Sequence, residues 1–300
     1  MSALLGNPMV TTAALPLLLG IALALLVRFA RLGALPIATL SWAALVLFFY
    51  LDTLGAPVLP PIAASQKLVY LAVAGIAIGL LPGRMLSGRA AGLLPAAAVV
   101  AAFLWLGWRR VEAGPLDLQM IAACIVGLLV AVGATVLVSL RDAPSPSAEQ
   151  QFLAPAAVLA MSIAGAIVSV LGASIVTGQL LGSLAALIGG WCLVEYLAVL
   201  GGRTAGPGWS KGVGFLTFYA TGTVLIQVAL LAPKVNLAAL ALSPLPPMVA
   251  ALARGPLQSL LPGARPLRPL VAGLLIAIPA MLAVLAAIVW APHGAALGFS

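Results

Sequence analysis

Apolar runs of about the length of a membrane-crossing helix recur along the whole chain, and short polar segments separate them. The first run covers about residues 10–27 and ends at Arg28, and later ones cover about 118–140, 212–232 and 270–290. A helix needs about 20 apolar residues to cross the hydrocarbon core of a bilayer, because it rises only about 1.5 Å per residue. This recurrence predicts a bundle of transmembrane helices.

The low charge content agrees with this interpretation. Only 7% of the 300 residues are charged and 64% are hydrophobic, whereas about 25% of the residues in soluble domains are charged. About ten crossings use roughly 200 residues, and the loops use the rest, so that a soluble catalytic domain has no room. We therefore predict an all-α integral membrane protein, a polytopic bundle of about ten transmembrane helices.

Positive charge is distributed unevenly between alternate loops. If the N-terminus lies outside, ten crossings place ten of the 14 lysine and arginine residues on the cytoplasmic side and leave Lys67, Arg109, Arg110 and Lys234 outside. Basic residues are retained on the cytoplasmic side during membrane insertion. The sequence therefore predicts a multi-pass protein of a bacterial inner (plasma) membrane, with both termini on the periplasmic side.

The longest polar stretch, residues 141–151, divides the chain into two nearly equal parts. Its proline, serine and charged residues are typical of an exposed linker. We predict a first membrane half at 1–140 and a second at 152–300, each with about five helices. An odd number of crossings inverts the second half relative to the first, so the pattern allows the inverted repeat on which many secondary transporters are built.

The ninth apolar run, residues 235–253, is interrupted by Pro244, Pro246 and Pro247. Proline removes a backbone donor and breaks a regular helix. Two interpretations remain open, a kinked crossing and a half-helix that re-enters from one side. Only a crossing keeps the arginines that follow on the cytoplasmic side, and we therefore count the run among the ten.

Glu195 is the only acidic residue well inside an apolar run. A carboxylate in hydrocarbon costs a few kcal/mol, so it usually faces the bundle interior or a cavity. Cys192 lies three residues earlier on the same helix face, and Trp191 and Tyr196 flank the pair. We predict that these four residues line a pathway for a substrate or an ion. The structural alternative is that Glu195 pairs with a basic residue near the cytoplasmic interface.

Lys67 and Tyr70 begin the third run, directly after a proline-rich segment. We predict that they line an outward-facing vestibule on the same pathway. The alternative for Lys67 is that its ammonium group extends to the lipid headgroups while its aliphatic stem stays in the apolar layer.

Small and polar residues inside other runs predict close packing between helices. Gly75 and Gly79 have the small-xxx-small spacing that lets two membrane helices approach closely. Gln179, Thr221, Thr223 and Gln227 are expected to form hydrogen bonds between helices.

Patterns typical of enzymes, cofactor sites and metal sites are missing. The sequence contains no GxxxxGKS loop, no HExxH, no GxSxG and no acidic cluster. Cys124 and Cys192 have no CxxC spacing, and the one histidine, His293, lies in the C-terminal tail. We therefore predict no enzymatic activity, cofactor, metal or disulfide framework. The net charge of +8 comes from scattered arginines, which does not indicate nucleic-acid binding.

The function predicted first is that of a transporter or permease for a small solute or ion, which requires a water-accessible cavity reaching Glu195. The alternative is a non-catalytic membrane subunit or scaffold, whose small-residue faces bind other membrane subunits or a second copy of the chain. A third hypothesis is a lipid-modifying enzyme that holds a headgroup phosphate with the pair Arg109 and Arg110 or with Arg265 and Arg268. The lipid bilayer is the one partner that all three share.

Overall fold

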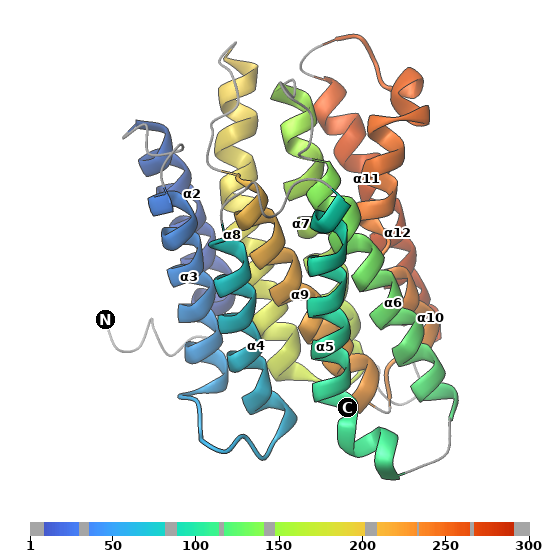
Figure 1. Ribbon diagram of the computed structural model, residues 1–300. Coiled ribbons are helices and arrows are strands. Elements are labelled where there is room, and N and C mark those ends of the chain that lie inside the picture. Colours follow the sequence, from blue (N-terminus) through green and yellow to red (C-terminus); the bar gives the residue numbers. More distant parts are fainter. Residues whose placement is uncertain are drawn as a thin grey trace, which may run out of the picture.

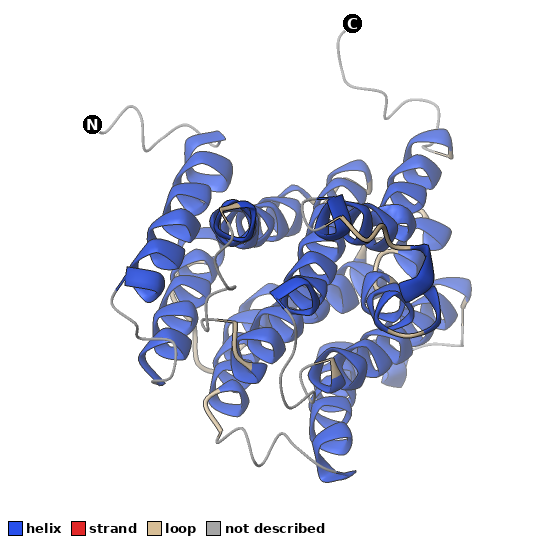
Figure 2. Ribbon diagram, turned by 90° about the horizontal axis from the view of Figure 1, so that it is seen from above, coloured by secondary structure: helices blue, strands red, loops and turns tan. Residues whose placement is uncertain are grey.

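The computed structural model describes residues 9–29, 36–81, 89–113, 117–140, 148–201, 209–232, 234–264 and 267–290. Within these ranges the regular structure is helical and contains no strand (Figures 1 and 2). Nine helices of the described residues are long and apolar enough to cross a membrane. The predicted all-α membrane bundle is therefore confirmed.

The first half contains η1 (Val10–Ala14), α2 (Leu15–Phe29), α3 (Pro36–Leu54), α4 (Ala64–Gly79), α5 (Arg89–Ala113) and α6 (Leu118–Ser139). The second half contains α7 (Ala148–Leu171), α8 (Ile175–Leu200), α9 (Lys211–Leu231), α10 (Leu237–Leu242), α11 (Pro246–Arg254), η3 (Pro256–Leu260) and α12 (Leu267–Val289). Successive crossings alternate in direction, so α2 ends at the upper end of the bundle in Figure 1 and α3 ends at the lower end.

Helix α4 is the short crossing that the third apolar run predicts. Its 16 residues make it shorter than the nine candidate spans. At 1.5 Å per residue such a helix rises roughly 24 Å, a few Å less than the thickness of the hydrocarbon core. Together with the nine longer spans of the described residues, α4 makes up the ten predicted crossings.

The proline-interrupted run forms two consecutive short helices, α10 and α11. Pro246 and Pro247 occupy the first turn of α11, where a missing N–H is tolerated because it has no partner inside the helix. Both helices continue from the lower toward the upper end of the bundle (Figure 1), so this run is a broken crossing. The pair packs against α6, α7 and α12, which surround the break with protein, as broken backbone at membrane depth requires.

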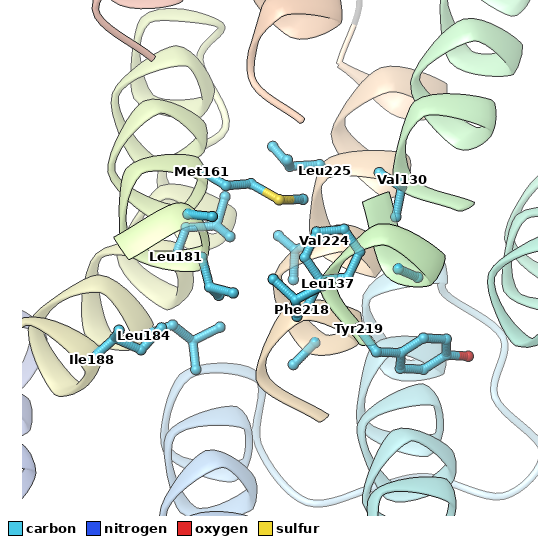
Figure 3. Close-up of a cluster of buried hydrophobic side chains, with 14 of the residues drawn as sticks. Val130, Leu137, Met161, Leu181, Leu184, Ile188, Phe218, Tyr219, Val224 and Leu225 are labelled. Atoms are coloured by element: carbon cyan, nitrogen blue, oxygen red, sulfur yellow. The ribbon is translucent and has the colours of Figure 1, made fainter. Parts of the chain in front are cut away.

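Helix α9 is the centre of the bundle. Every residue from Gly212 to Leu230 is buried, and α3 through α8 all pack against this helix. Figure 3 shows side chains of α9, such as Leu225, between Val130 of α6 on one side and Leu181 of α8 on the other. A helix that is enclosed on all sides has no lipid-facing surface, so α9 is shielded from the bilayer along nearly its whole length.

Glycines bring pairs of helices into backbone contact at two places. Between α2 and α8, Gly20 and Gly190 each lie against a backbone carbonyl of the facing helix. Between α4 and α9, Gly79 and Gly212 each lie against the other's carbonyl, while Gly75 faces a tyrosine ring of α9. The close packing predicted from Gly75 and Gly79 is therefore confirmed, and a Cβ at these positions would overlap its neighbour.

The same contacts interleave the two predicted halves. Helix α2 packs on α8, and α4 and α6 pack on α9, so helices from 1–140 and from 152–300 alternate in space. Residues 148–151, assigned to the linker from the sequence, form the first turn of α7, while 141–147 lie outside the described residues. The inverted relationship between the halves stays a prediction.

Candidate functional site

Glu195 lies near the upper end of α8, and its side chain is paired with that of Arg28 on α2. The distance from Arg28 Nη1 to Glu195 Oε2 is 3.6 Å, and the two side chains are 16% and 6% exposed. Arg28 lies in the last turn of α2, where a cation also interacts favourably with the negative end of the helix dipole. The basic partner named as the structural alternative is thus present at this end of the bundle.

Three tryptophans lie close to one another at the same end. The ring centroid of Trp42, on α3, is 5.4 Å from that of Trp191 and 5.1 Å from that of Trp209, which precedes α9. All three rings are buried, and the indole N–H groups of Trp42 and Trp209 donate no hydrogen bond within the described residues. Their faces form an apolar wall that binds the crossings of the two halves together.

Trp191, Cys192 and Glu195 line one cleft, as their spacing on a single helix predicts. Trp209 and Phe152 close this cleft from the sides, and its free volume is about 10 Å³. A volume of this size holds about one water molecule. Tyr196 is half-buried and does not line the cleft. The structure therefore brings together three of the four residues predicted around Glu195, in a space that is closed to a solute.

Lys67 and Tyr70 lie at the lower end and take no part in the Glu195 cleft. The ammonium group of Lys67 donates to the Trp105 carbonyl (2.8 Å) and lies 5.7 Å from the centroid of the Trp105 ring. Tyr70 donates its hydroxyl to the Val58 carbonyl (3.0 Å) and contacts the same ring edge-on. These contacts fasten α4 to α5 and to the preceding loop, so the six predicted residues are divided between the two ends of the bundle.

Arg110, one of the two neighbouring arginines that the predicted topology leaves outside, has a structural role at the lower end. Arg110 donates to the Leu230 carbonyl, and Gln119 donates to the carbonyls of Ala229 and Ala232 (3.3 and 3.2 Å). The last carbonyls of a helix have no partner inside it and carry the negative end of its dipole. Arg110 and Gln119 thus cap the buried end of α9.

Asp117 holds Arg110 in place. As the N-cap of α6 it accepts a hydrogen bond from the Met120 N–H (2.7 Å), and it accepts another from Arg110 (2.9 Å). The Met120 N–H and the Arg110 guanidinium together hold the pKa of Asp117 below its usual range. The carboxylate therefore stays ionised at neutral pH and fixes the orientation of the arginine.

Replacement of Arg110 with methionine is expected to lower the free energy of unfolding by about 1.5–3 kcal/mol, because the end of α9 loses a charged donor. Arg109→Met is the matched control, since it removes the same charge from an exposed neighbour; we expect a change within about 0.5 kcal/mol. Denaturant unfolding in micelles measures both. Equal losses in the two variants would contradict the capping role.

A cavity of about 290 Å³ opens at the lower end, between the turn from α7 to α8 and the end of α9. We call it the lower cavity. The side chains that line it with polar groups are those of Ser174, Thr177, Gln227 and Lys234. Val228 and Leu231 contribute apolar wall.

The turn beside the lower cavity ends α7 with a Schellman motif. Ser174 N–H donates to the Ser169 carbonyl (2.8 Å) and Ala173 N–H to the Val170 carbonyl (3.0 Å), which are the two hydrogen bonds of that motif. Ala173 has a φ of 63°, the left-handed conformation for which glycine is the usual residue. The motif places Ser174 at the start of α8 and at the edge of the cavity.

The polar side chains of α9 differ in the hydrogen bonds that they form. Thr221 shares a hydrogen bond with Ser162 of α7 (3.1 Å), which confirms the predicted contact between helices. Thr223 donates to the Ala220 carbonyl of its own helix (3.0 Å) and also interacts with the Tyr50 side chain of α3. Gln227 is only 8% exposed, and its buried Oε1 accepts no hydrogen bond from any described residue. The prediction for Gln227 is therefore corrected, since this amide lines the lower cavity.

Comparison of the chain with models of known protein families, with curated proteins and with solved structures gives no match. Within the described residues, no three His, Cys, Asp or Glu side chains come together as metal ligands would. The two ends of the bundle, one open and one closed, are thus the features that bear on function.

Proposed function

We propose that this protein is a secondary transporter or permease for a small solute or ion, which opens one end of the bundle at a time. The contrast between the two ends carries the proposal. The lower cavity reaches Gln227 on the central helix, whereas the Glu195 cleft at the upper end is almost filled and bears the Arg28–Glu195 pair. Alternating access needs one open and one closed end around a central site.

The position of α2 supports a movable upper end. This helix packs mainly on α8, with a lighter contact to α3, and it lies at the edge of the bundle (Figure 1). The ion pair between Arg28 and Glu195 joins α2 to α8 beside the closed cleft. Residues of α7, α8 and Trp209 line the cleft, and within the described residues α2 reaches it only through the pair that Arg28 makes with Glu195. A displacement of α2 that separates the two charges would release Glu195 in the cleft wall without disturbing the enclosed α9.

We further propose that the upper end faces the cytoplasm of a bacterial inner membrane, with both termini outside. Five basic residues of the described chain lie at this end: Arg28, Arg89, Lys211, Arg254 and Arg268. The positive-inside rule favours this orientation, and the capping role of Arg110 accounts for one of the charges left on the other side.

A scaffold that binds partner helices or a second copy has less support. It needs faces of small residues on the outside of the bundle, whereas Gly20, Gly79, Gly190 and Gly212 are engaged in contacts within the chain. Catalysis on a lipid also has less support, because Arg110 is bonded to α9, and Arg265 lies outside the described residues.

Thiol labelling from each side of the membrane tests the proposal without a known substrate. One variant keeps Cys192 at the closed end and carries Cys124→Ala. A second carries Ser174→Cys at the lower cavity with both natural cysteines replaced by alanine. A membrane-impermeant maleimide is added to each, with and without Glu195→Gln. Transport predicts a reciprocal change, in which Glu195→Gln raises labelling of Cys192 from the upper side several-fold and lowers labelling at position 174 from the lower side.

The directions in which labelling changes at positions 192 and 174 decide whether alternating access is retained. A rise at both positions would mean that Glu195→Gln only loosens the bundle, and no change at either would mean a rigid protein; both results reject alternating access. A third variant, which keeps Cys124 and carries Cys192→Ala, is the matched control. Cys124 is exposed on the outside of α6, where we expect lipid, so its labelling should not respond to Glu195→Gln.

A further inference from the structure

We propose that the lower cavity binds a small carboxylate that also carries an N–H or O–H donor. This inference rests on the proposed transport function and deepens it, because it names the chemical class of the solute. Three parts of the cavity support it: the start of α8, the ammonium group of Lys234 and the amide of Gln227.

The start of α8 offers donors to an anion. Ser174 is the N-cap of this 26-residue helix, yet its side chain accepts no hydrogen bond from a backbone N–H of the first turn. Its hydroxyl oxygen instead accepts a hydrogen bond from the Thr177 hydroxyl (2.6 Å), so the first N–H groups of α8 have no side-chain cap. The first N–H groups of a helix have no partner inside it, and they carry the positive end of the helix dipole. Such an end binds a carboxylate readily when it faces a cavity, and Ser174 and Thr177 place this end in the cavity wall.

Lys234 adds one full positive charge beside the same cavity. It is exposed and follows the end of α9, so its ammonium group can meet a solute entering from the lower side. One lysine balances a single negative charge, which favours a monoanion over a dianion such as phosphate. The volume of about 290 Å³ lies at the small end of the range for ligand sites, which limits the solute to a small molecule.

Gln227 is the reason that the solute should carry a hydrogen-bond donor. Its amide oxygen is buried and accepts no hydrogen bond from the described residues, and an unsatisfied buried acceptor is unfavourable. Rotation about the last side-chain bond is broad and roughly two-fold for glutamine, so this oxygen can turn toward the cavity. An ammonium or hydroxyl group of the solute would satisfy it while the carboxylate of the same molecule lies at the start of α8.

Thermal unfolding of the full-length protein in micelles, measured against solute concentration, tests the inference. The probes are the sodium salts of lactate, acetate and phosphate, together with glycine and methylammonium chloride, at constant ionic strength. Lactate and glycine carry both groups, acetate lacks the additional donor, and methylammonium lacks the carboxylate. A saturable rise of the unfolding temperature is expected with lactate or glycine, at concentrations about ten-fold lower than any effect of the other three.

Two variants assign the binding to the cavity. Lys234→Gln is expected to weaken binding about ten-fold or more, because a charge-assisted hydrogen bond is lost, whereas Lys67→Gln, a lysine at the same end but outside the cavity, leaves it unchanged. Gln227→Leu is expected to remove the preference for lactate or glycine over acetate. This variant also loses an unsatisfied buried amide, so it should unfold at a higher temperature without solute, and lost binding then cannot reflect misfolding.

Any of three results would overturn the inference: no saturable effect of lactate or glycine, stronger binding of phosphate or methylammonium, or binding that survives both Lys234→Gln and Gln227→Leu. Thiol labelling decides the transport function separately. Reciprocal labelling without carboxylate binding retains transport and rejects this site, whereas carboxylate binding without reciprocal labelling retains the site and rejects transport.

Discussion

Replacement of Gly212 with alanine is expected to lower the free energy of unfolding by about 1–3 kcal/mol, the usual cost of overpacking, or to prevent folding. The added Cβ would overlap the backbone carbonyl of Gly79, and a methyl group of Thr39 lies close by as well. A flexible side chain could move aside at little cost, but a helix backbone cannot. Because α9 is enclosed by α3 through α8 and by the short α10, it cannot shift away from α4 without disturbing the others.

Gly182→Ala is the matched control for this prediction. Gly182 also lies inside a membrane helix, α8, but no heavy atom lies within 4 Å of the position that its Cβ would take. Alanine is favoured over glycine in a helix by about 0.5–1 kcal/mol, so this variant should be neutral or slightly more stable. Denaturant unfolding in micelles measures the two variants side by side, and a stable Gly212→Ala protein would contradict the backbone contact between α4 and α9.

Loss of one member of the Arg28–Glu195 pair is the second large effect that we expect. Glu195→Met should lower the free energy of unfolding by about 3 kcal/mol, because it leaves a mostly buried cation without its carboxylate. The 16% exposure of the Arg28 side chain and its place in the last turn of α2 keep the loss at the lower end of the known range, since the guanidinium can extend toward the headgroups.

A double-mutant cycle separates this pair from simple packing. The variant with both Arg28→Met and Glu195→Met should lose less stability than the two single variants added together, with a coupling energy of about 0.5–3 kcal/mol. Replacement of a whole buried ion pair with apolar side chains is often tolerated. Strictly additive losses would show that the two charges act independently, and the closing role of the pair would have to be abandoned.

Most of the fold could be predicted because each crossing is encoded in its own segment of sequence. The length of an apolar run, the arginines that follow it and the prolines inside it are local features. They were sufficient for the short α4 and for the broken crossing of α10 and α11. The arrangement of the helices is different, since it depends on how distant faces fit together, and no local pattern placed α9 in the middle of the others.

The candidate site could be predicted only in part for the same reason. The cleft around Trp191, Cys192 and Glu195 follows from spacing on one helix, but Trp42 and Trp209 enter it from distant segments that carry no shared signal. The lower cavity was missed because each of its residues is ordinary in its own context. The sequence indicates a turn at residues 172–178, but its left-handed position holds Ala173 instead of glycine, so the form of the turn could not be predicted.

The enclosure of α9 has a consequence for how the chain is assembled. Six of the helices that surround it, α3 through α8, precede it in the sequence, and only the short α10 follows it; membrane helices are made one after another from the N-terminus. A ribosome therefore delivers the central helix after most of its surroundings have been inserted, and these neighbours must stay open on one side until α9 passes between them. Truncation just before Lys211 should thus leave an unfinished ring of helices, exposed to cellular quality control.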